Sequence, residues 1–290
     1  MKKLSLFKAG FKRKSGTIIF MAAGAIAVLS ILVLGTTSSV TQALKLARRV
    51  TDTETCAYIA SSVARVMRVV FASDATPVCV TVYDLRDREI PFGDKTAFVS
   101  FKDEQSKINI DLAPKEVLLR LPTLSGDKNL VDAIVAANIA VQEELLLIEG
   151  MTREIYDELK EITTAHGIGT INIHTATEGS LYALGMDSDL VNKIQAYLAG
   201  DDGELATLDD KIFSSVIDIV PSLAPYGLTA EQASLLQSLI ATGQLGTTTD
   251  RVRFEIVVKK NERVLKTYSI VVAAAGGQIV GSGIVSWSEV

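Results

Sequence analysis

One feature constrains this chain more than any other: an uninterrupted apolar run close to its N-terminus. Residues 17–35, TIIFMAAGAIAVLSILVLG, contain no charged side chain. A helix of this length rises about 29 Å at 1.5 Å per residue, which matches the hydrocarbon thickness of a bilayer. The run therefore predicts one membrane-spanning helix.

The charges of the chain are unevenly distributed. The formal net charge is −5, and because six positive and no negative charges precede Gly16, the remaining residues carry −11. Basic residues beside a span tend to stay cytoplasmic, so we expect the body of the protein on the other side. An acidic body also argues against nucleic acid as the main partner. The six basic residues are Lys2, Lys3, Lys8, Lys12, Arg13 and Lys14.

The helical pattern continues past the apolar run to about residue 72. Apolar residues recur at helical spacing from Leu44 to Val70, with lysines and arginines between them. We therefore expect one long N-terminal helix over residues 17–72. Its first part, 17–35, would span the membrane, and its second part would lead into a globular head.

Short segments rich in β-branched and aromatic residues flank a long central region. They predict strands at 78–83, 97–101, 252–258, 264–273 and 279–287, with turns at 93–95, 260–262 and 276–277. The long helix needs a surface that covers its apolar stripe. The expected fold class is therefore α+β, with the long helix packed on an antiparallel sheet.

The central region, residues 103–248, has helical patterning and almost no strand signal. Thr152 and Ser188 are expected N-caps, and Thr229 with Gln232 forms a predicted capping box. We expect an all-helical domain inserted into the head, between its first strands at 73–102 and its last strands at 249–290. The predicted helices cover residues 114–121, 129–144, 152–162, 178–184, 188–199, 209–219 and 229–242.

The inserted region contains an internal echo. Lys107-Ile-Asn-Ile110 leads to Ala113, Leu118 and Leu121, and the same pattern recurs 63 residues later from Thr170-Ile-Asn-Ile173 to Ala176, Leu181 and Leu184. An Asn side chain can hydrogen-bond backbone groups where a loop meets a helix. We therefore expect structural rather than catalytic roles for Asn109 and Asn172.

The chain has two cysteines, Cys56 and Cys79. If the head lies outside the cytoplasm, a disulfide between them is chemically permitted. Two small buried hydrophobic side chains are an equally good interpretation. No Cys-x-x-Cys pair points to zinc or redox chemistry.

The junction before the apolar run resembles the processing site of prepilin peptidase. A basic leader, residues 1–16, ends in Lys14-Ser15-Gly16, and this peptidase cuts after a glycine on the cytoplasmic side of the membrane. Cleavage there would expose Thr17 and leave the apolar helix intact. A plain signal anchor with a chance glycine is the alternative.

Four further segments, taken in order, resemble the general secretion pathway protein K family of minor pseudopilins. They are residues 101–110 (FKDEQSKINI), 144–156 (ELLLIEGMTREIY), 171–176 (INIHTA) and 286–289 (SWSE). The fifth position after the expected cleavage site is Met21, where most pilin-like subunits carry Glu. Absence of this Glu is typical of protein K sequences.

The resemblance implies an assembly subunit with a pilin-like head. Such a protein would lie at the tip of the type II secretion pseudopilus and prime its assembly for secretion across the outer membrane. The implied partners are minor pseudopilins I and J, the major pseudopilin and prepilin peptidase. The implied location is the inner membrane, crossed once, with a cytoplasmic N-terminus and a periplasmic head.

Calcium is the one metal that the resemblance brings in, and no other cofactor is expected. Hard oxygen ligands are offered by Asp187, Asp189, Asp201 and Asp202, with Asp209 and Asp210 nearby in sequence. No segment matches an EF-hand. Solvated charge and helix capping are therefore the favoured interpretation of these aspartates.

Two other functional classes are alternatives to the pseudopilin. The turns at Gly150 and Gly185 resemble helix–hairpin–helix modules, which would suit a membrane-anchored, extracytoplasmic DNA-binding protein. Acidic residues surround both turns, where phosphate binding requires Lys or Arg. An enzyme is not expected, because His166 and His174 read as loop residues and have no partner at metal-ligand spacing.

Overall fold

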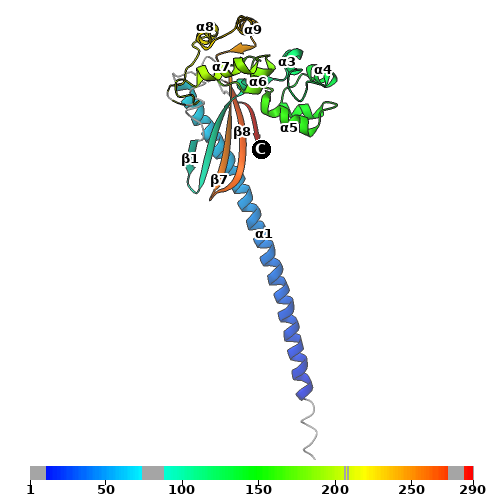
Figure 1. The fold of residues 1–290 in the computed structure, drawn as a ribbon. Coiled ribbons are helices and arrows are strands. Elements are labelled where there is room, and N and C mark those ends of the chain that lie inside the picture. Colours follow the sequence, from blue (N-terminus) through cyan, green and yellow to red (C-terminus); the bar gives the residue numbers. More distant parts are fainter. Residues whose placement is uncertain (1–10, 74–87, 206, 208, 274–283, 290) are drawn as a thin grey trace, which may run out of the picture. The chain divides into compact units, whose positions relative to one another are not determined.

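The structure is a computed structural model that describes residues 11–73, 88–205, 207, 209–273 and 284–289. The chain divides into two compact units, Met1–Ala57 and Tyr58–Val290. The first unit holds most of one long helix. The second holds the end of that helix, a five-stranded sheet and a set of short helices (Figure 1).

Helix α1 (Phe11–Ser73) confirms the predicted long N-terminal helix and begins before residue 17. Hydroxyl side chains in its apolar half donate to carbonyl oxygens of the preceding turn: Ser30 to Ile26 at 2.8 Å and Ser39 to Gly35 at 3.0 Å. These bonds satisfy polar groups within the helix itself, as an apolar environment requires.

The part of α1 that belongs to the second unit buries one stripe of side chains. Ile59, Ala60, Val63, Ala64 and Met67 are buried, at the spacing of a single helical face. Two alanines in the stripe leave room for close packing. The amphipathic pattern predicted for this part of the helix is thus present.

The sheet has the strand order β1-β2-β7-β8-β9, with every neighbouring pair antiparallel. Alternate side chains of β2 and β7 are buried, and Phe101 lies opposite Phe254 with ring centroids 4.9 Å apart. This alternation is what a sheet with one covered face requires. The strands are β1 (Arg88–Phe92), β2 (Lys95–Asp103), β7 (Arg251–Lys260), β8 (Arg263–Ala273) and β9 (Ile284–Glu289).

Two predicted hairpin turns are confirmed by the backbone. Gly93 has a φ of 63° between β1 and β2. Asn261 and Glu262 have φ of 46° and 64° between β7 and β8, so both central residues of that turn are left-handed, as in a type I′ hairpin.

The edges of the sheet were predicted less well. The strand expected at 78–83 and the turn at 276–277 lie outside the described residues. Strand β1 was not predicted, and its five residues include Pro91 and two charged side chains. Proline is tolerated there because β1 is an edge strand.

The region between β2 and β7 is largely helical, and Figure 1 shows its helices gathered at one end of the sheet. It also contains two short parallel strand pairs that were not predicted: β3 (Ile108–Asn109) with β4 (Thr163–Thr164), and β5 (Ile171–Asn172) with β6 (Leu245–Gly246). The α-helices are α3 (Lys115–Leu118), α4 (Lys128–Ala137), α5 (Arg153–Ile162), α6 (Glu178–Ala183), α7 (Ser188–Leu198), α8 (Ile219–Leu223) and α9 (Ala230–Ala241).

Four short 3₁₀ segments also lie in the described part of this region. Two predicted helices are shorter in the structure than expected. The helix expected at 129–144 ends at Ala137 because Asn138 is left-handed, with a φ of 50°. The segments are η1 (Glu104–Ser106), η2 (Gln142–Leu147), η3 (Val216–Asp218) and η4 (Ala224–Tyr226).

The helix expected at 209–219 does not form over its first half. Asp209 instead accepts hydrogen bonds from the amides of Asp201 and Asp202, at 2.7 and 3.0 Å. A side chain that bonds backbone in this way competes with helix formation. Helical structure therefore starts only at η3.

Helix caps follow the sequence in two of three cases. Thr152 caps α5, and Thr229 with Gln232 forms the predicted capping box of α9. Ser188 is not a cap: Asp187 takes that place at α7 and accepts from the Leu190 amide at 2.7 Å. A carboxylate is a better acceptor near the positive end of the helix dipole than a hydroxyl one residue later.

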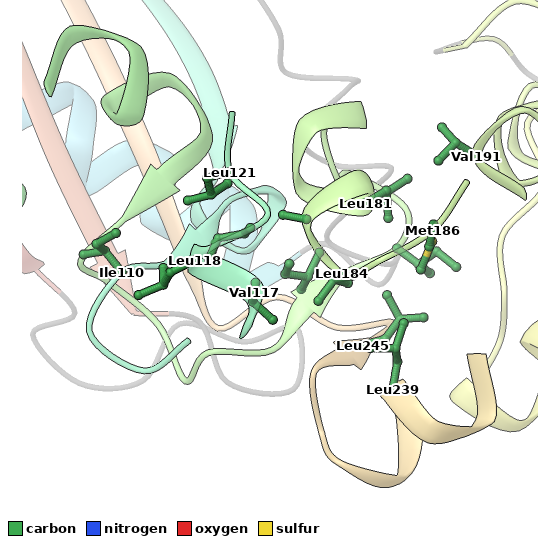
Figure 2. Close-up of a cluster of buried hydrophobic side chains, with 14 of the residues drawn as sticks. Ile110, Val117, Leu118, Leu121, Leu181, Leu184, Met186, Val191, Leu239 and Leu245 are labelled. Carbon is green, nitrogen blue, oxygen red and sulfur yellow. The ribbon is translucent and has the colours of Figure 1, made fainter. Parts of the chain in front are cut away.

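One hydrophobic cluster fills the inserted region. Figure 2 shows side chains from its first half, such as Leu118 and Leu121, in the same cluster as Leu181 and Leu184 from its second half. Each of these leucines is buried, which stabilises the fold by about 2 kcal/mol per side chain. The two halves of the internal echo therefore share one core.

Candidate functional site

The described residues contain no group of three or more His, Cys, Asp or Glu side chains placed to hold a metal ion. The features that stand out are the apolar half of α1, the two turns of the internal echo, and a polar junction where the helical region joins the sheet.

The apolar half of α1 is long and hydrophobic enough to cross a membrane. Within Ile18–Met67, an 18-residue window has a mean hydropathy of 2.7, and none of that window is buried. Met21 is among the exposed side chains, and 73% of its surface is accessible. So large an apolar surface needs a lipid or protein environment.

The expected processing site, Gly16 and Thr17, lies within α1 near its start. The structure describes the backbone there and not the side chains. Cleavage at this position stays a prediction.

The Asn109 side chain organises the first turn of the echo. Its Oδ1 accepts from the amides of Asp111 and Leu112 at 3.0 and 3.1 Å, and its Nδ2 donates to the carbonyls of His166 and Gly167 at 3.2 and 3.0 Å. One amide side chain thus ties the start of α3 to the loop that follows β4.

The Asn172 side chain occupies the equivalent place in the second turn but reaches different partners. Its Oδ1 accepts from the His174 amide at 3.2 Å. Its Nδ2 donates to Asp103, the last residue of β2, at 3.0 Å and to Thr249, just before β7, at 2.8 Å. The first Asn bonds only within the helical region, whereas the second connects that region to the sheet.

The echo extends over both halves of the helical region. In each half the first short strand pairs with the last, and the residue four positions after the Asn donates to its carbonyl at 2.9 Å. Helices α5 and α9 also match, since each follows a Gly-x-Thr sequence with a left-handed Gly and a capping Thr. The pairs Gly150–Thr152 and Gly227–Thr229 could have shown this in the sequence.

The turns at Gly150 and Gly185 require glycine, with φ of 91° and 92°. At Gly185 an added Cβ would lie 3.1 Å from Nη1 of Arg120, which donates to the Ala183 carbonyl. The amides of Gly185, Met186 and Met151 all donate to carbonyls inside the protein. These turns therefore have few amides left to offer to phosphate, which disfavours DNA binding.

The candidate calcium ligands lie in two separate places, the start of α7 and the loop after it. Asp187 and Asp189 lie on either side of Ser188, the first residue of α7. Both accept from Nε2 of the Gln232 side chain, and Asp189 also pairs with Lys193 at 2.5 Å. Asp201 and Asp202 belong to the loop built around Asp209. Hydrogen bonds from Thr207 and from those two backbone amides lower the pKa of Asp209 to about 2. Capping and loop closure account for these aspartates.

The junction between the helical region and the sheet centres on the buried carboxylate of Asp103, the last residue of β2. It accepts from the Gln105 amide at 2.8 Å, Asn172 at 3.0 Å, and the hydroxyls of Thr175 and Thr249 at 2.5 Å. Burial raises the pKa of this carboxyl, although the four hydrogen bonds favour its charged form.

A second charged pair lies beside Asp103. Glu104 is buried and pairs with Arg253 on β7, and it also accepts from the Thr164 hydroxyl. Burial raises the pKa of Glu104, but the hydrogen bond and charge of Arg253 outweigh it, so the net pKa is lowered. Arg253 in turn donates to Ser269 on β8 at 2.9 Å.

His174 extends the network into the loop before η3. Its Nε2 accepts from the Phe213 amide at 2.9 Å, so Nδ1 carries the proton and faces Asn172 Oδ1 at 3.1 Å. Burial lowers the pKa of His174 to about 4. The sequence placed His174 in a loop but gave no sign of this buried, neutral role.

Cys56 is buried in α1, whereas Cys79 lies outside the described residues. A disulfide between them stays a prediction.

Comparison with solved structures finds a similar fold. No protein family model and no curated protein sequence matches the chain. Among solved structures, it is similar to a chain of the GspK-GspI-GspJ complex from the type 2 secretion system of enterotoxigenic Escherichia coli. The TM-score is 0.63 at 14% sequence identity, over 83% of this chain and 98% of that one. The expected pilin-like fold, with a long apolar helix, a five-stranded antiparallel sheet and added helices, is thereby confirmed.

Proposed function

We propose that this chain is a minor pseudopilin of a type II secretion system, of the protein K kind, and acts by assembly and not as an enzyme. The observation that carries the proposal is the fold. A pseudopilin-like architecture covers nearly the whole of a chain from the GspK-GspI-GspJ complex and includes the large helical region between β2 and β7. The ordered segments that resemble protein K support the same assignment independently.

The proposed location is the inner membrane, crossed once by the apolar half of α1. The basic leader would remain cytoplasmic and the head would be periplasmic. Prepilin peptidase would remove residues 1–16 after Gly16 and leave Thr17 as the N-terminus.

The proposed position is the tip of the pseudopilus, together with minor pseudopilins I and J above the major pseudopilin. Met21 supports this position. A carboxylate inside a bilayer is costly without a positive partner, such as the terminal amine of a neighbouring subunit. A subunit without this carboxylate cannot form that contact toward a neighbour above it, so it suits the end of a filament.

The first experiment measures processing. The full chain is expressed in membranes with and without prepilin peptidase, and its intact mass and N-terminal residue are determined. We expect loss of residues 1–16, exposing Thr17, only when the peptidase is present. Co-purification of the processed form with minor pseudopilins I and J is the expected second result.

A matched pair of variants sharpens this test. Gly16→Leu should block cleavage, whereas Gly10→Leu, at the other glycine of the leader, should not. An uncut wild-type chain, or a cut beyond Gly35, would contradict the pseudopilin assignment.

A further inference from the structure

The chain passes between the sheet and the helical region twice, at neighbouring places. It leaves β2 after Asp103 and returns at β7, where Asp103 lies opposite Val252 in the strand register. A domain attached through two adjacent strands could swing about them as a hinge. Whether it does depends on the contacts at the crossing.

Every residue of the outgoing crossing, Asp103–Ser106, is hydrogen-bonded, and the first three each bond both the sheet side and the helical region. Asp103 accepts from Asn172 and Thr175 of the helical region and from Thr249 just before β7. Glu104 bonds Arg253 on the sheet and Thr164 in the helical region. Each of the two carboxylates therefore bridges the two parts.

Gln105 also bridges the two parts, whereas Ser106 bonds the helical region. Gln105 donates to the Thr170 carbonyl at 3.1 Å and accepts from the Asp250 amide, next to β7. The Ser106 carbonyl accepts from the Thr177 amide at 3.2 Å and the Ser180 hydroxyl at 2.8 Å. The side chains of Asp103, Glu104 and Gln105 are almost fully buried.

A buried carboxylate is stable only when its hydrogen bonds are made, so the arrangement of its donors is strongly restricted. Rotation of the helical region about the two strands would pull Asn172 and Thr175 away from Asp103. Of the three donors to Asp103 Oδ2, the Thr249 hydroxyl alone would remain on this buried oxygen. Bending at this crossing therefore carries a cost that an ordinary linker lacks.

We infer that Asp103–Ser106 is a rigid brace that holds the helical region at one orientation to the sheet, with Asp103 and Asn172 as its positioning residues. Movement or load on the helical region is then passed to the sheet without bending at the crossing. The brace is a property of the chain alone and does not depend on the proposed function. In a tip subunit it would keep the head one solid body.

Distances between spin labels on the full-length chain test the brace. One label replaces Glu262 in the β7–β8 turn and the other replaces Glu158 on α5, both exposed. A ketone-bearing amino acid at each position leaves Cys56 and Cys79 untouched. We expect a narrow distance distribution that Asn172→Ala broadens about twofold, as hinge motion begins.

Asn109→Ala is the matched control. It removes the equivalent side chain from the first turn, whose bonds stay within the helical region. It should leave the distribution between Glu158 and Glu262 narrow. A second label pair, at Glu158 and Glu231 inside the helical region, reports whether that region remains folded.

The inference would be overturned by a broad distribution in the unchanged chain, by a folded Asn172→Ala variant whose distribution stays narrow, or by equal broadening in the Asn109 and Asn172 variants. If Asn172→Ala unfolds the helical region, Thr175→Val takes its place. That change removes one donor to Asp103 at constant shape. It should broaden only the distance across the crossing, and no broadening would refute the brace.

Discussion

At the scale of single residues, His174 couples stability to pH. Its pKa in the folded protein is about 4, against an ordinary 6.5, because burial disfavours the charged ring. A depressed histidine pKa means that the unfolded chain binds the extra proton. The stability is therefore fully present above pH 6.5 and falls as the pH drops toward 4, by about 3 kcal/mol at most. Thermal unfolding between pH 7.5 and 4 should show this loss.

The His174→Gln variant isolates the effect. Glutamine can accept from the Phe213 amide and donate to Asn172 without a titrating group. We expect a clearly flatter pH dependence for this variant, whereas His166→Gln should keep most of the wild-type slope. An unchanged slope in His174→Gln would rule out this histidine as the source.

At the scale of elements, local signals predicted more than long-range ones. The apolar run and helical spacing predicted α1, and β-branched and aromatic residues bounded by turns predicted β2, β7 and β8. Thr152 and Thr229 predicted two helix starts because a cap is read from four residues. Strand β1 and the paired short strands went unseen, because their partners, not their own sequences, determine them.

The cap of α7 gives a prediction at this scale. Asp187 accepts from the Leu190 amide and from Gln232, so Asp187→Ala should lower the free energy of unfolding by about 1–2 kcal/mol. Ser188→Ala, one residue later, should change it by less than about 0.5 kcal/mol, since its exposed side chain is not the cap. Denaturant unfolding of both variants measures the difference, and the reverse order would restore Ser188 as the cap.

At the scale of the whole molecule, the polar junction lay beyond the reach of sequence reasoning. Asp103 binds Thr175 and Thr249, which are 72 and 146 residues further along the chain. Asp103 and Thr175 lie in two of the segments that resemble protein K, but nothing in those segments shows that the two side chains meet. The two Asn turns, by contrast, were visible because they repeat.

Charge is unevenly divided between the helical region and the rest of the chain. Residues 103–248 contain 23 acidic and 8 basic side chains, so the helical region carries −15 while the rest of the chain carries +10. Such a surface repels anionic polymers and lipid headgroups. It suits a head that projects from the membrane better than one that binds nucleic acid.

The proposed position at the filament tip rests on two features that can be changed separately: Met21 and the bulk of residues 104–251. Met21→Glu supplies the carboxylate that repeating pilin subunits use. Replacing 104–251 by an Asn-Gly turn joins Asp103 to Val252, which are already partners in the antiparallel register of β2 and β7. Protease resistance of the shortened head should first establish that its sheet still folds.

We expect each change alone to leave the chain at about one copy per filament, because either the missing carboxylate or the bulky head still prevents stacking. Combined, they should let the chain enter the filament body, so that its ratio to the major pseudopilin in sheared filaments rises severalfold. Met21→Leu with the short turn is the control, since it adds no carboxylate, and it should stay at the single-copy level. If Met21→Glu alone enters the body, the helical region does not limit stacking; if the double variant stays at one copy, some other contact determines the position at the tip.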